Sequence, residues 1–411
     1  MAKKGGTVET LSTTCVIAGG GPAGIMAGFL LAHAGVDVTV LEKHKDFLRD
    51  FRGDTVHPST LELMWELGLL EKFLALPHTE IRNIGVDIGD RKYTVGDFSR
   101  LSTHCKFTAL MPQWDFLDFL SAEARRYPHF HLMMQTEAMD LLASGERIAG
   151  VLARTPSGNI AIRAGLTIAA DGRHSTLRAK SGLTVKDIGA PFDVLWLSLP
   201  TKEGDPTEPV ARVTGGQFLV MLYRGDHWQC AFLIPKGGLE TLKAEGISGF
   251  RSRLRSVAGF ARDRADTIQS FDQIKLLTVA IDRLEQWARP GLLCIGDAAH
   301  AMSPVGGVGI NLAIQDAVAA ANILGPVLRR GIPDLRELKK IQKRREFPMK
   351  LIQGFQVLAQ NRFLAPTLRQ TSTPKAPWLL KLVSRSPWLQ QWPARFLGVG
   401  VRPEHVQPEK S

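Results

Sequence analysis

The chain has 411 residues, 44% of them hydrophobic and 22% charged. This suits two domains of a globular protein and argues against a disordered or membrane-embedded chain. The net charge of +11 is uneven, because residues 329–411 hold 17 Lys+Arg against 5 Asp+Glu (+12), whereas residues 1–328 hold 34 against 35 (−1). No nucleic-acid-binding motif accompanies the basic segment, which favours a solvated helical face over a nucleic-acid partner.

The cysteines and the N-terminal residues give expectations about compartment. The four cysteines are scattered without a CxxC pair. This pattern argues against a zinc site or a disulfide framework and fits a reducing compartment. The first residues, MAKKGGTVETLSTT, lack the apolar run of a signal peptide. We therefore expect a cytoplasmic protein.

A strand, a glycine-rich turn and a helix are predicted at the start of the chain. Residues 14–18 form a short, mostly apolar strand, residues 22–34 a helix of small apolar residues, and residues 36–41 a second strand that closes on Glu42. The turn reads GGGPAG and contains Gly19-x-Gly21-x-x-Gly24. Glu42 follows Gly24 by 18 positions, near the roughly 20 expected for an acid that holds a ribose hydroxyl. The unit predicts a dinucleotide site, with the diphosphate at the helix N-terminus.

Two further strand ends carry polar motifs. An apolar strand from Leu166 leads into Asp171-Gly172, and Ser175 can open the helix that follows. A strand over Leu292–Ile295 delivers Gly296-Asp297, and a proline- and glycine-rich loop then opens a long alanine-rich helix from about Asn311. Taken alone, each motif also fits an ordinary turn or strand end. Helical periodicity then continues to about Gln360.

Residues 87–98 and about 192–279 have a β-rich texture instead. The runs Gln217–Tyr223 and Trp228–Ile234 flank a short turn and predict an antiparallel hairpin. Alternation places Trp228 and Cys230 on one face and Gln229 on the other, but it leaves open which face covers a substrate. His227 is interpreted as an exposed turn residue rather than a base.

The tail places Trp378, Trp388 and Trp392 among leucines and basic residues. Such a stretch can lie on a membrane surface, or it can pack across the dinucleotide-binding domain as a closing helix. Three prolines interrupt it at positions 377, 387 and 393, which favours packing because proline ends or kinks a helix.

The motifs, in this order and spacing, resemble the flavin-dependent aromatic hydroxylases of the para-hydroxybenzoate hydroxylase type, the class A (single-component) flavoprotein monooxygenases, over roughly residues 14–345. The resemblance implies an α/β fold with a Rossmann-like, glutathione-reductase-like FAD-binding domain, an inserted antiparallel-sheet substrate domain and a C-terminal helical region. It assigns residues 1–80, 100–185 and 280–345 to the FAD-binding domain, 81–99 and 186–279 to the substrate domain, and 346–411 to a basic helical segment.

The resemblance also implies roles for individual residues. It places the diphosphate at Gly19, Gly21, Pro22, Ala23 and Gly24, and the adenosine ribose at Glu42 with Lys43 beside it. Further FAD contacts are implied at Arg52 and Gln113, and the nicotinamide-linked motif at Asp171 and Gly172. The ribityl chain is placed at Gly296 and Asp297, and the pyrimidine edge of the isoalloxazine at Gly306, Gly307, Gly309, Ile310 and Asn311. A helix N-terminus at that edge would stabilise reduced flavin.

The expected catalytic residues are Pro304, His57 and Tyr223. Pro304 lies where the family's loop passes the reacting centre. His57 has a helix-start or packing role as its alternative, with Ser59 or Thr60 as the N-cap. For Tyr223, plain packing is the alternative to a contact with a polar substrate group.

In that family NADH or NADPH reduces FAD, and O2 then hydroxylates an aromatic or similar electron-rich molecule through an FAD C4a-hydroperoxide. The resemblance therefore implies FAD, NAD(P)H as co-substrate, no metal, and a fairly hydrophobic small-molecule substrate for a monomer or homodimer. Weak contact of the tail with a membrane surface stays open as an alternative.

The alternative functions are a reductase or halogenase of the same fold, or a membrane-docked redox sensor without turnover. The Trp-x-Trp-x-Ile-Pro of halogenases is missing, since no two tryptophans are spaced two apart.

Overall fold

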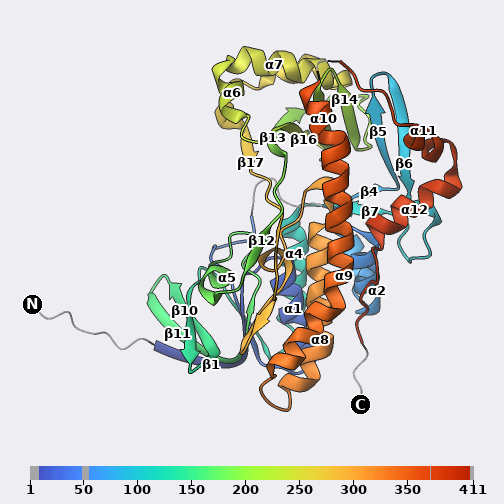
Figure 1. Ribbon diagram of the computed structural model, residues 1–411. Coiled ribbons are helices and arrows are strands. Elements are labelled where there is room, and N and C mark those ends of the chain that lie inside the picture. Colours follow the sequence, from blue (N-terminus) through green and yellow to red (C-terminus); the bar gives the residue numbers. More distant parts are fainter. Residues whose placement is uncertain (1–8, 49–54, 371, 408–411) are drawn as a thin grey trace, which may run out of the picture.

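The computed structural model describes residues 9–48, 55–370 and 372–407. Its lower half in Figure 1 is built on an eight-stranded sheet, whose order is β19-β20-β11-β1-β2-β8, with β10 and β9 joined beside β11. The central strands β20, β11, β1, β2 and β8 are parallel. The strands are β1 (Glu9–Ala18), β2 (Val38–Leu41), β8 (Phe130–Met133), β9 (Glu137–Ser144), β10 (Arg147–Thr155), β11 (Gly158–Ala169), β19 (Ala288–Arg289) and β20 (Leu292–Cys294).

Helices cover this sheet and bury its apolar strands. Helix α1 packs against α4 and α8, and α8 packs against α9. Helix α1 can approach the sheet closely because Gly28 has no side chain; a Cβ there would lie 2.6 Å from Cγ2 of Val40. The helices of this half are α1 (Pro22–His33), α2 (Pro58–Glu66), α3 (Leu70–Leu74), α4 (Gln113–Ala124), α5 (Thr176–Ser181), α8 (Gly309–Leu328) and α9 (Leu335–Ala359).

A seven-stranded sheet forms the upper half, in the order β17-β13-β16-β15-β14-β5-β6. The expected hairpin is present, since β15 and β16 pair antiparallel from Phe218 to Tyr223. The strands are β5 (Asn83–Ile88), β6 (Arg91–Asp97), β13 (Phe192–Pro200), β14 (Val210–Thr214), β15 (Gln217–Tyr223), β16 (His227–Pro235) and β17 (Lys275–Leu277).

The two faces of the upper sheet meet different neighbours. One face carries Trp228, Cys230 and Phe232 and packs beneath the helices at the top of Figure 1, α6 (Leu239–Ala244) and α7 (Gly246–Val257). The opposite face carries Phe218, Val220 and Ala231 and clusters with Val305 of the lower half. The end of α9 and the short α10 (Ala365–Arg369) also contact this second face.

Smaller elements connect the halves. A three-stranded sheet joins β3 (Thr55–Val56), β7 (Thr108–Leu110) and β4 (Thr79–Ile81), and a two-stranded ribbon joins β12 (Val185–Asp187) to β18 (Asp282–Leu284). Helix α9 rises from the lower half toward the upper sheet (Figure 1) and begins with a capping box between Asp334 and Glu337. The chain ends in α11 (Trp378–Arg385) and α12 (Pro387–Gly398), which pack on β6 at the right of Figure 1.

Most expected elements lie within a few residues of the observed ones, with two corrections. Ser59 and Thr60 do not cap α2, because both lie inside it and His57 is the N-cap. The predicted boundary between residues 345 and 346 falls inside α9, which is continuous. Elsewhere the two sheets divide as the domain prediction divides the sequence, and we propose that division with α9 shared between the parts.

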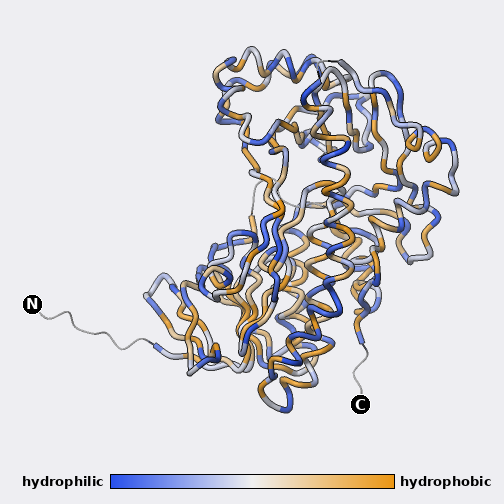
Figure 2. The backbone as a smooth tube through the Cα atoms, viewed as in Figure 1, coloured by the Kyte–Doolittle hydropathy of each residue, from blue (hydrophilic) through white to orange (hydrophobic). Residues whose placement is uncertain are grey.

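Among the described residues, Val305–Leu328 is one helical stretch long and apolar enough to cross a membrane, and it is mostly buried within the protein. Figure 2 shows apolar colour in this part of the lower half, where α8 packs against α1 and α9. Burial of this kind is typical of a core helix.

Candidate active site

The predicted motifs meet at one edge of the parallel sheet. Ala18, the last residue of β1, lies opposite Leu41 of β2 and Ala169 of β11. Ala169 in turn lies opposite Cys294 of β20. The strands therefore end in register, and each is followed by one of the polar or glycine-rich segments singled out in the sequence. Ligands of open α/β sheets bind beyond the carboxyl ends of the strands.

The three glycines of the first turn have different neighbours. Gly19 has φ of +105°, and a Cβ there would lie 2.3 Å from the carbonyl oxygen of Ala170; a Cβ at Gly24 would lie 1.9 Å from that of Gly19. A Cβ at Gly21, in contrast, would meet no protein atom within 4 Å. Gly19 and Gly24 are therefore required by the protein's own packing, whereas Gly21 borders open space. Pro22 starts α1, and no described side chain caps its N-terminus.

Glu42 lies over this turn. Its carboxylate accepts hydrogen bonds from the backbone N–H of Gly20 (3.1 Å) and of His44 (2.9 Å), and its side chain is buried. Glu42 is thus held at the rim of the glycine turn. Lys43 beside it is exposed.

Asp171 forms hydrogen bonds within the turn that leads from β11 to α5. Its carboxylate accepts hydrogen bonds from the Ser175 hydroxyl and from the backbone N–H of Leu177 (3.1 Å), while Ser175 caps α5 as expected. Burial raises the pKa of Asp171 above its ordinary value although these hydrogen bonds oppose the shift. Gly172 has φ of +84° and would have no neighbour within 4 Å of a Cβ. The contacts indicate that Asp171 positions the turn.

Asp297 faces an arginine that the sequence interpretation missed. Its carboxylate lies 3.4 Å from Nη2 of Arg173, and about a quarter of each side chain is exposed. Gly296 before it has φ of +58°, and a Cβ would lie 3.1 Å from the Cβ atoms of both Ala23 and Ala313. The turn therefore sits where the starts of α1 and α8 converge, with Asp297 on the accessible side. Arg173 directly follows the Asp-Gly pair, which was its sequence signal.

Hydrogen bonds with Thr55 and with Gln356 of α9 hold the loop before α8 in place. Thr55 donates its hydroxyl hydrogen to the carbonyl of Gly307 (2.9 Å), and Gly306 and Gly307 both have positive φ. On the other side Gln356 of α9, fully buried, contacts the backbone of Ser303 and Val305 (2.8–3.2 Å). Gln356 is a second residue that sequence reasoning missed. A polar residue on the buried side of α9 was its only signal.

The side chain of Asn311 has protein partners. Its amide oxygen accepts from the His57 N–H (3.0 Å) and the Thr60 hydroxyl (2.7 Å), and its amide nitrogen donates to the carbonyl of Thr55 (3.2 Å). Asn311 therefore ties α8 to the start of α2. Gly309 and Ile310 begin α8, whose N-terminus also lacks a side-chain cap among the described residues.

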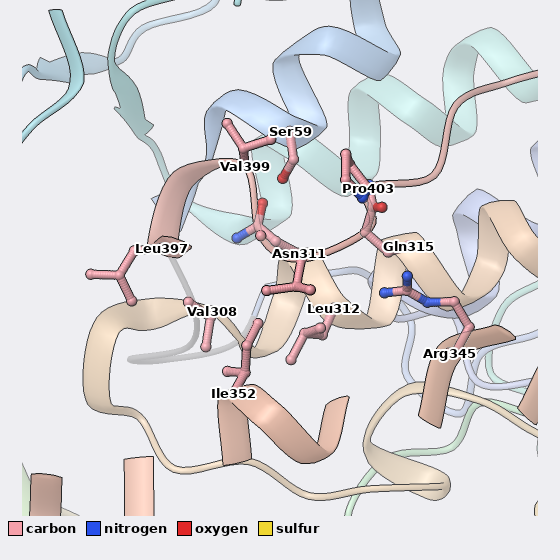
Figure 3. Close-up of a pocket in the computed structure, with 12 residues that line it drawn as sticks. Ser59, Val308, Asn311, Leu312, Gln315, Arg345, Ile352, Leu397, Val399 and Pro403 are labelled. Atoms are coloured by element: carbon pink, nitrogen blue, oxygen red, sulfur yellow. The ribbon is translucent and has the colours of Figure 1, made fainter. Parts of the chain in front are cut away.

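Figure 3 shows a cavity beside Asn311, which is also lined by Ser59, Leu312, Gln315 and Arg345 among others. Its volume of ≈ 20 Å³ suffices for about one water molecule. The cavity is too small for a cofactor or substrate. It lies where α8, α9 and the C-terminal segment meet.

His57 is engaged by the C-terminal segment. Its imidazole Nδ1 lies 2.8 Å from the carbonyl oxygen of Leu397, which makes it the donor in a neutral ring. Burial lowers the pKa of His57 to about 4, although this hydrogen bond opposes the shift. The side chain thus anchors α12, which supports the packing alternative for His57.

The lowered pKa of His57 predicts an acid-sensitive fold. In the unfolded chain the pKa of His57 is about 6.5, whereas in the folded protein it is about 4. Between these two pH values the unfolded chain therefore binds a proton that the folded protein does not. Stability should therefore fall as the pH drops through this interval, by up to about 3 kcal/mol. His57→Gln, which keeps a donor for Leu397, should flatten the dependence of melting temperature on pH between 7 and 4. His104→Gln, at an exposed histidine, is the control, and an unchanged slope in His57→Gln would contradict the prediction.

Tyr223 lies on the other face of the substrate sheet. Its ring packs at 5.4 Å from that of Trp228, in the cluster covered by α7. The face near the loop carries Trp196, Phe218 and Val220, which cluster with Val305. The expected catalytic role of Tyr223 is therefore corrected to packing, because strand alternation turns its side chain away from the loop.

Three expectations remain to be placed. Pro304 is exposed at the start of the turn that contains Val305. Gln113 is half-buried at the first position of α4, whereas Arg52 lies outside the described residues. Over residues 9–48, 55–370 and 372–407, no three His, Cys, Asp or Glu side chains gather into a group that could hold a metal ion.

Comparisons with known proteins give a family match, sequence relatives and similar folds. A family model described as "FAD binding domain" matches residues 12–354. The 6-methylpretetramide 4-monooxygenase of Streptomyces rimosus is 32% identical over 91% of this chain and 89% of its own length. The solved structure of p-nitrophenol 4-monooxygenase PnpA from Pseudomonas putida superimposes with a TM-score of 0.77 at 18% identity, covering 96% of this chain and all of that one. The flavin-dependent brominase Bmp2 gives 0.73 at 16% identity, covering 94% of each chain. The two structural likenesses confirm the expected fold class and, at such identities, nothing further.

Proposed function

The chain belongs to the FAD binding domain family, and on this premise we propose that it is an FAD-dependent monooxygenase that hydroxylates an aromatic, fairly hydrophobic small molecule with NAD(P)H and O2. One observation carries this proposal: β1, β2, β11 and β20 end in register. Because they do, the glycine turn, Glu42, Arg173 and Asp297 lie together at one edge of the parallel sheet. The family and the named relatives supply the flavin and the reaction type.

The residues present suit FAD. The open space over Gly21 and the uncapped start of α1 provide N–H donors for a diphosphate. We assign Glu42 to the adenosine ribose and Asp297, oriented by Arg173, to the ribityl chain. The N-terminus of α8, held by Asn311 and Gln356, would place partial positive charge beside the ring system. When bound, FAD supplies hydride acceptance and oxygen activation, which protein side chains cannot provide.

The proposed substrate position lies between the loop at Pro304 and the upper sheet. The face there carries Trp196, Phe218 and Val220 together with Val305. Apolar and aromatic side chains would exclude water and hold a flat ring, which is the protein's main task in cofactor chemistry of this kind. Sequence relatives of this chain are named for 6-methylpretetramide and para-nitrophenol, and this supports an aromatic substrate.

Halogenation is the competing chemistry on this fold. The brominase likeness is at 16% identity and concerns the fold alone, whereas the monooxygenase relative is twice as similar in sequence and matches nearly the whole chain. No described feature specifically favours halogenation, so hydroxylation is the function we propose. Cytoplasmic location and oligomeric state stay predictions.

Stopped-flow absorbance tests the proposed function. The purified protein should show flavin absorbance that NADH or NADPH bleaches, and an aromatic substrate should accelerate that bleaching. Product analysis with labelled O2 should find one oxygen atom in the product. Flavin that neither nicotinamide reduces, across a panel of phenols and larger fused rings, would contradict the proposal, and a brominated product with bromide present would replace it by halogenation.

Replacing Asp297 should weaken flavin retention. Asp297→Ala removes a carboxylate acceptor whose hydrogen bond to a hydroxyl is worth about 1.5–3 kcal/mol, so FAD should bind roughly 10- to 100-fold more weakly. Fluorescence titration of the apoprotein with FAD measures this. Asp140→Ala, at a half-exposed carboxylate of β9 paired with Lys180, is the control. Full flavin occupancy in Asp297→Ala at low FAD would overturn the assignment.

A further inference from the structure

Helix α9 presents an apolar stripe to solvent. Phe347, Leu351, Phe355 and Leu358 follow one another at helical spacing, and all four are exposed, Leu358 to 59%. Residues spaced by three and four lie on one side of a helix. An exposed stripe of this length is unusual on a protein surface and indicates an interaction site.

Helix α12 continues the stripe. Trp388, Trp392 and Phe396 are spaced by four residues, and the rings of Trp388 and Trp392 lie 6.2 Å apart. Both tryptophans are more than half exposed. The ring of Phe396 lies 5.1 Å from that of Phe355 on α9, so the two stripes are continuous.

Helix α11 adds a third apolar side. Trp378 is 74% exposed, and Leu379 and Leu382 are each about half exposed. Helix α11 contacts α12, and the two helices lie together at the right of Figure 1. We call the exposed apolar residues of α9, α11 and α12 the tryptophan face. In Figure 2 the same helices carry apolar colour among hydrophilic positions.

The chain segment that carries the tryptophan face is strongly basic. Residues 347–407 hold eight Lys+Arg and one Asp+Glu. The single acid, Glu404, is buried and bonded to Arg344 and Arg345. Lys381, Arg385 and Arg395 are exposed beside the tryptophans, and within the described ranges they form no ion pair with an acid.

We propose that the tryptophan face binds the surface of a membrane rich in anionic lipid. Tryptophan is favoured where an apolar region meets a polar one, and lysine and arginine are attracted to anionic headgroups. Helices α11 and α12 have 8 and 12 residues, too few to cross a bilayer, which takes about 20. They would lie in the plane of the interface. A second copy of the chain fits less well, because a two-fold contact would oppose two basic surfaces.

Vesicle flotation tests this proposal with the purified full-length protein. Wild type should float with vesicles that contain phosphatidylglycerol and not with pure phosphatidylcholine vesicles, and salt should weaken the binding. Trp388→Ser/Trp392→Ser and Lys381→Glu/Arg385→Glu should each lower the bound fraction at least about tenfold, a loss of about 1.4 kcal/mol. Flavin content and melting temperature should stay at wild-type values, because these side chains lie at the surface.

Matched controls lie on elements outside the tryptophan face. Trp65→Ser removes an exposed tryptophan of α2, and Lys202→Glu/Lys243→Glu changes the same charge on the substrate domain; both should bind vesicles like wild type. Wild type that ignores anionic vesicles, or tryptophan variants that still bind them, would overturn the proposal. Light scattering that shows a dimer converted to monomer by Trp388→Ser/Trp392→Ser, without vesicle binding, would instead make the face a contact between copies.

Discussion

A Gly21→Val variant should fold normally and yet purify without flavin. The structure separates the two effects, because a Cβ at position 21 meets no protein atom within 4 Å, while the same space is the approach of the diphosphate to the start of α1 in the proposed complex. A branched side chain there would displace the ligand rather than the protein. We expect FAD to bind at least about 100-fold more weakly, a loss of about 3 kcal/mol. The apoprotein should melt at the wild-type apoprotein temperature.

Gly24→Ala is the matched comparison. Its Cβ would lie 1.9 Å from the carbonyl oxygen of Gly19, so even one methyl group forces α1 away from the end of β1. This variant should be less stable than wild type even without bound cofactor. Flavin titration and thermal melting of both apoproteins measure the contrast. A yellow Gly21→Val protein, or a Gly24→Ala protein of unchanged stability, would contradict this account of the turn.

Arg345→Met should destabilise the fold by about 3–5 kcal/mol, the usual cost of breaking a buried ion pair from one side. Arg345 is buried, and its Nε lies 3.1 Å from Asp316. Asp316 is also bonded to His300 (2.6 Å) and accepts from the N–H of Gly296 (3.1 Å). Burial alone would raise the pKa of Asp316, but His300 and Arg345 hold it below its ordinary value. At neutral pH the variant would leave a buried, ionised carboxylate short of a partner.

The same substitution should weaken flavin binding, because Asp316 holds the amide of Gly296 next to Asp297. Arg344→Met is the control, since Arg344 neighbours Arg345 in sequence and bonds to the same Glu404, but its side chain is half exposed. Chemical unfolding and flavin titration should separate the two variants clearly. Equal stabilities for Arg344→Met and Arg345→Met would show that the buried cluster contributes little.

The glycine turn and the strand-end motifs could be predicted from local sequence for a physical reason. Gly19, Gly21 and Gly24 directly follow the first strand, and the turn itself admits few other residues at Gly19 and Gly24. Ser175 was identified as an N-cap because its hydroxyl can satisfy a nearby N–H. The hairpin around Arg224 followed from alternation and a turn, both properties of a few consecutive residues. Where the decisive contacts lie within about one helical turn, the sequence was sufficient.

Tertiary structure decided every role that depends on a distant partner. The sequence left His57 with a catalytic role or a packing role, and only the structure shows that its ring bonds to Leu397, 340 residues further on. Tyr223 was correctly placed on a strand, yet only the packing of α7 showed which face it occupies. Arg173 meets Asp297 across 124 positions, and the loop contacts of Gln356 likewise come from another helix. The sequence by itself determined the strands, the turns and the chemical types that follow them. Only folding decided which side chains meet, because contacts between distant segments depend on how whole helices and sheets pack.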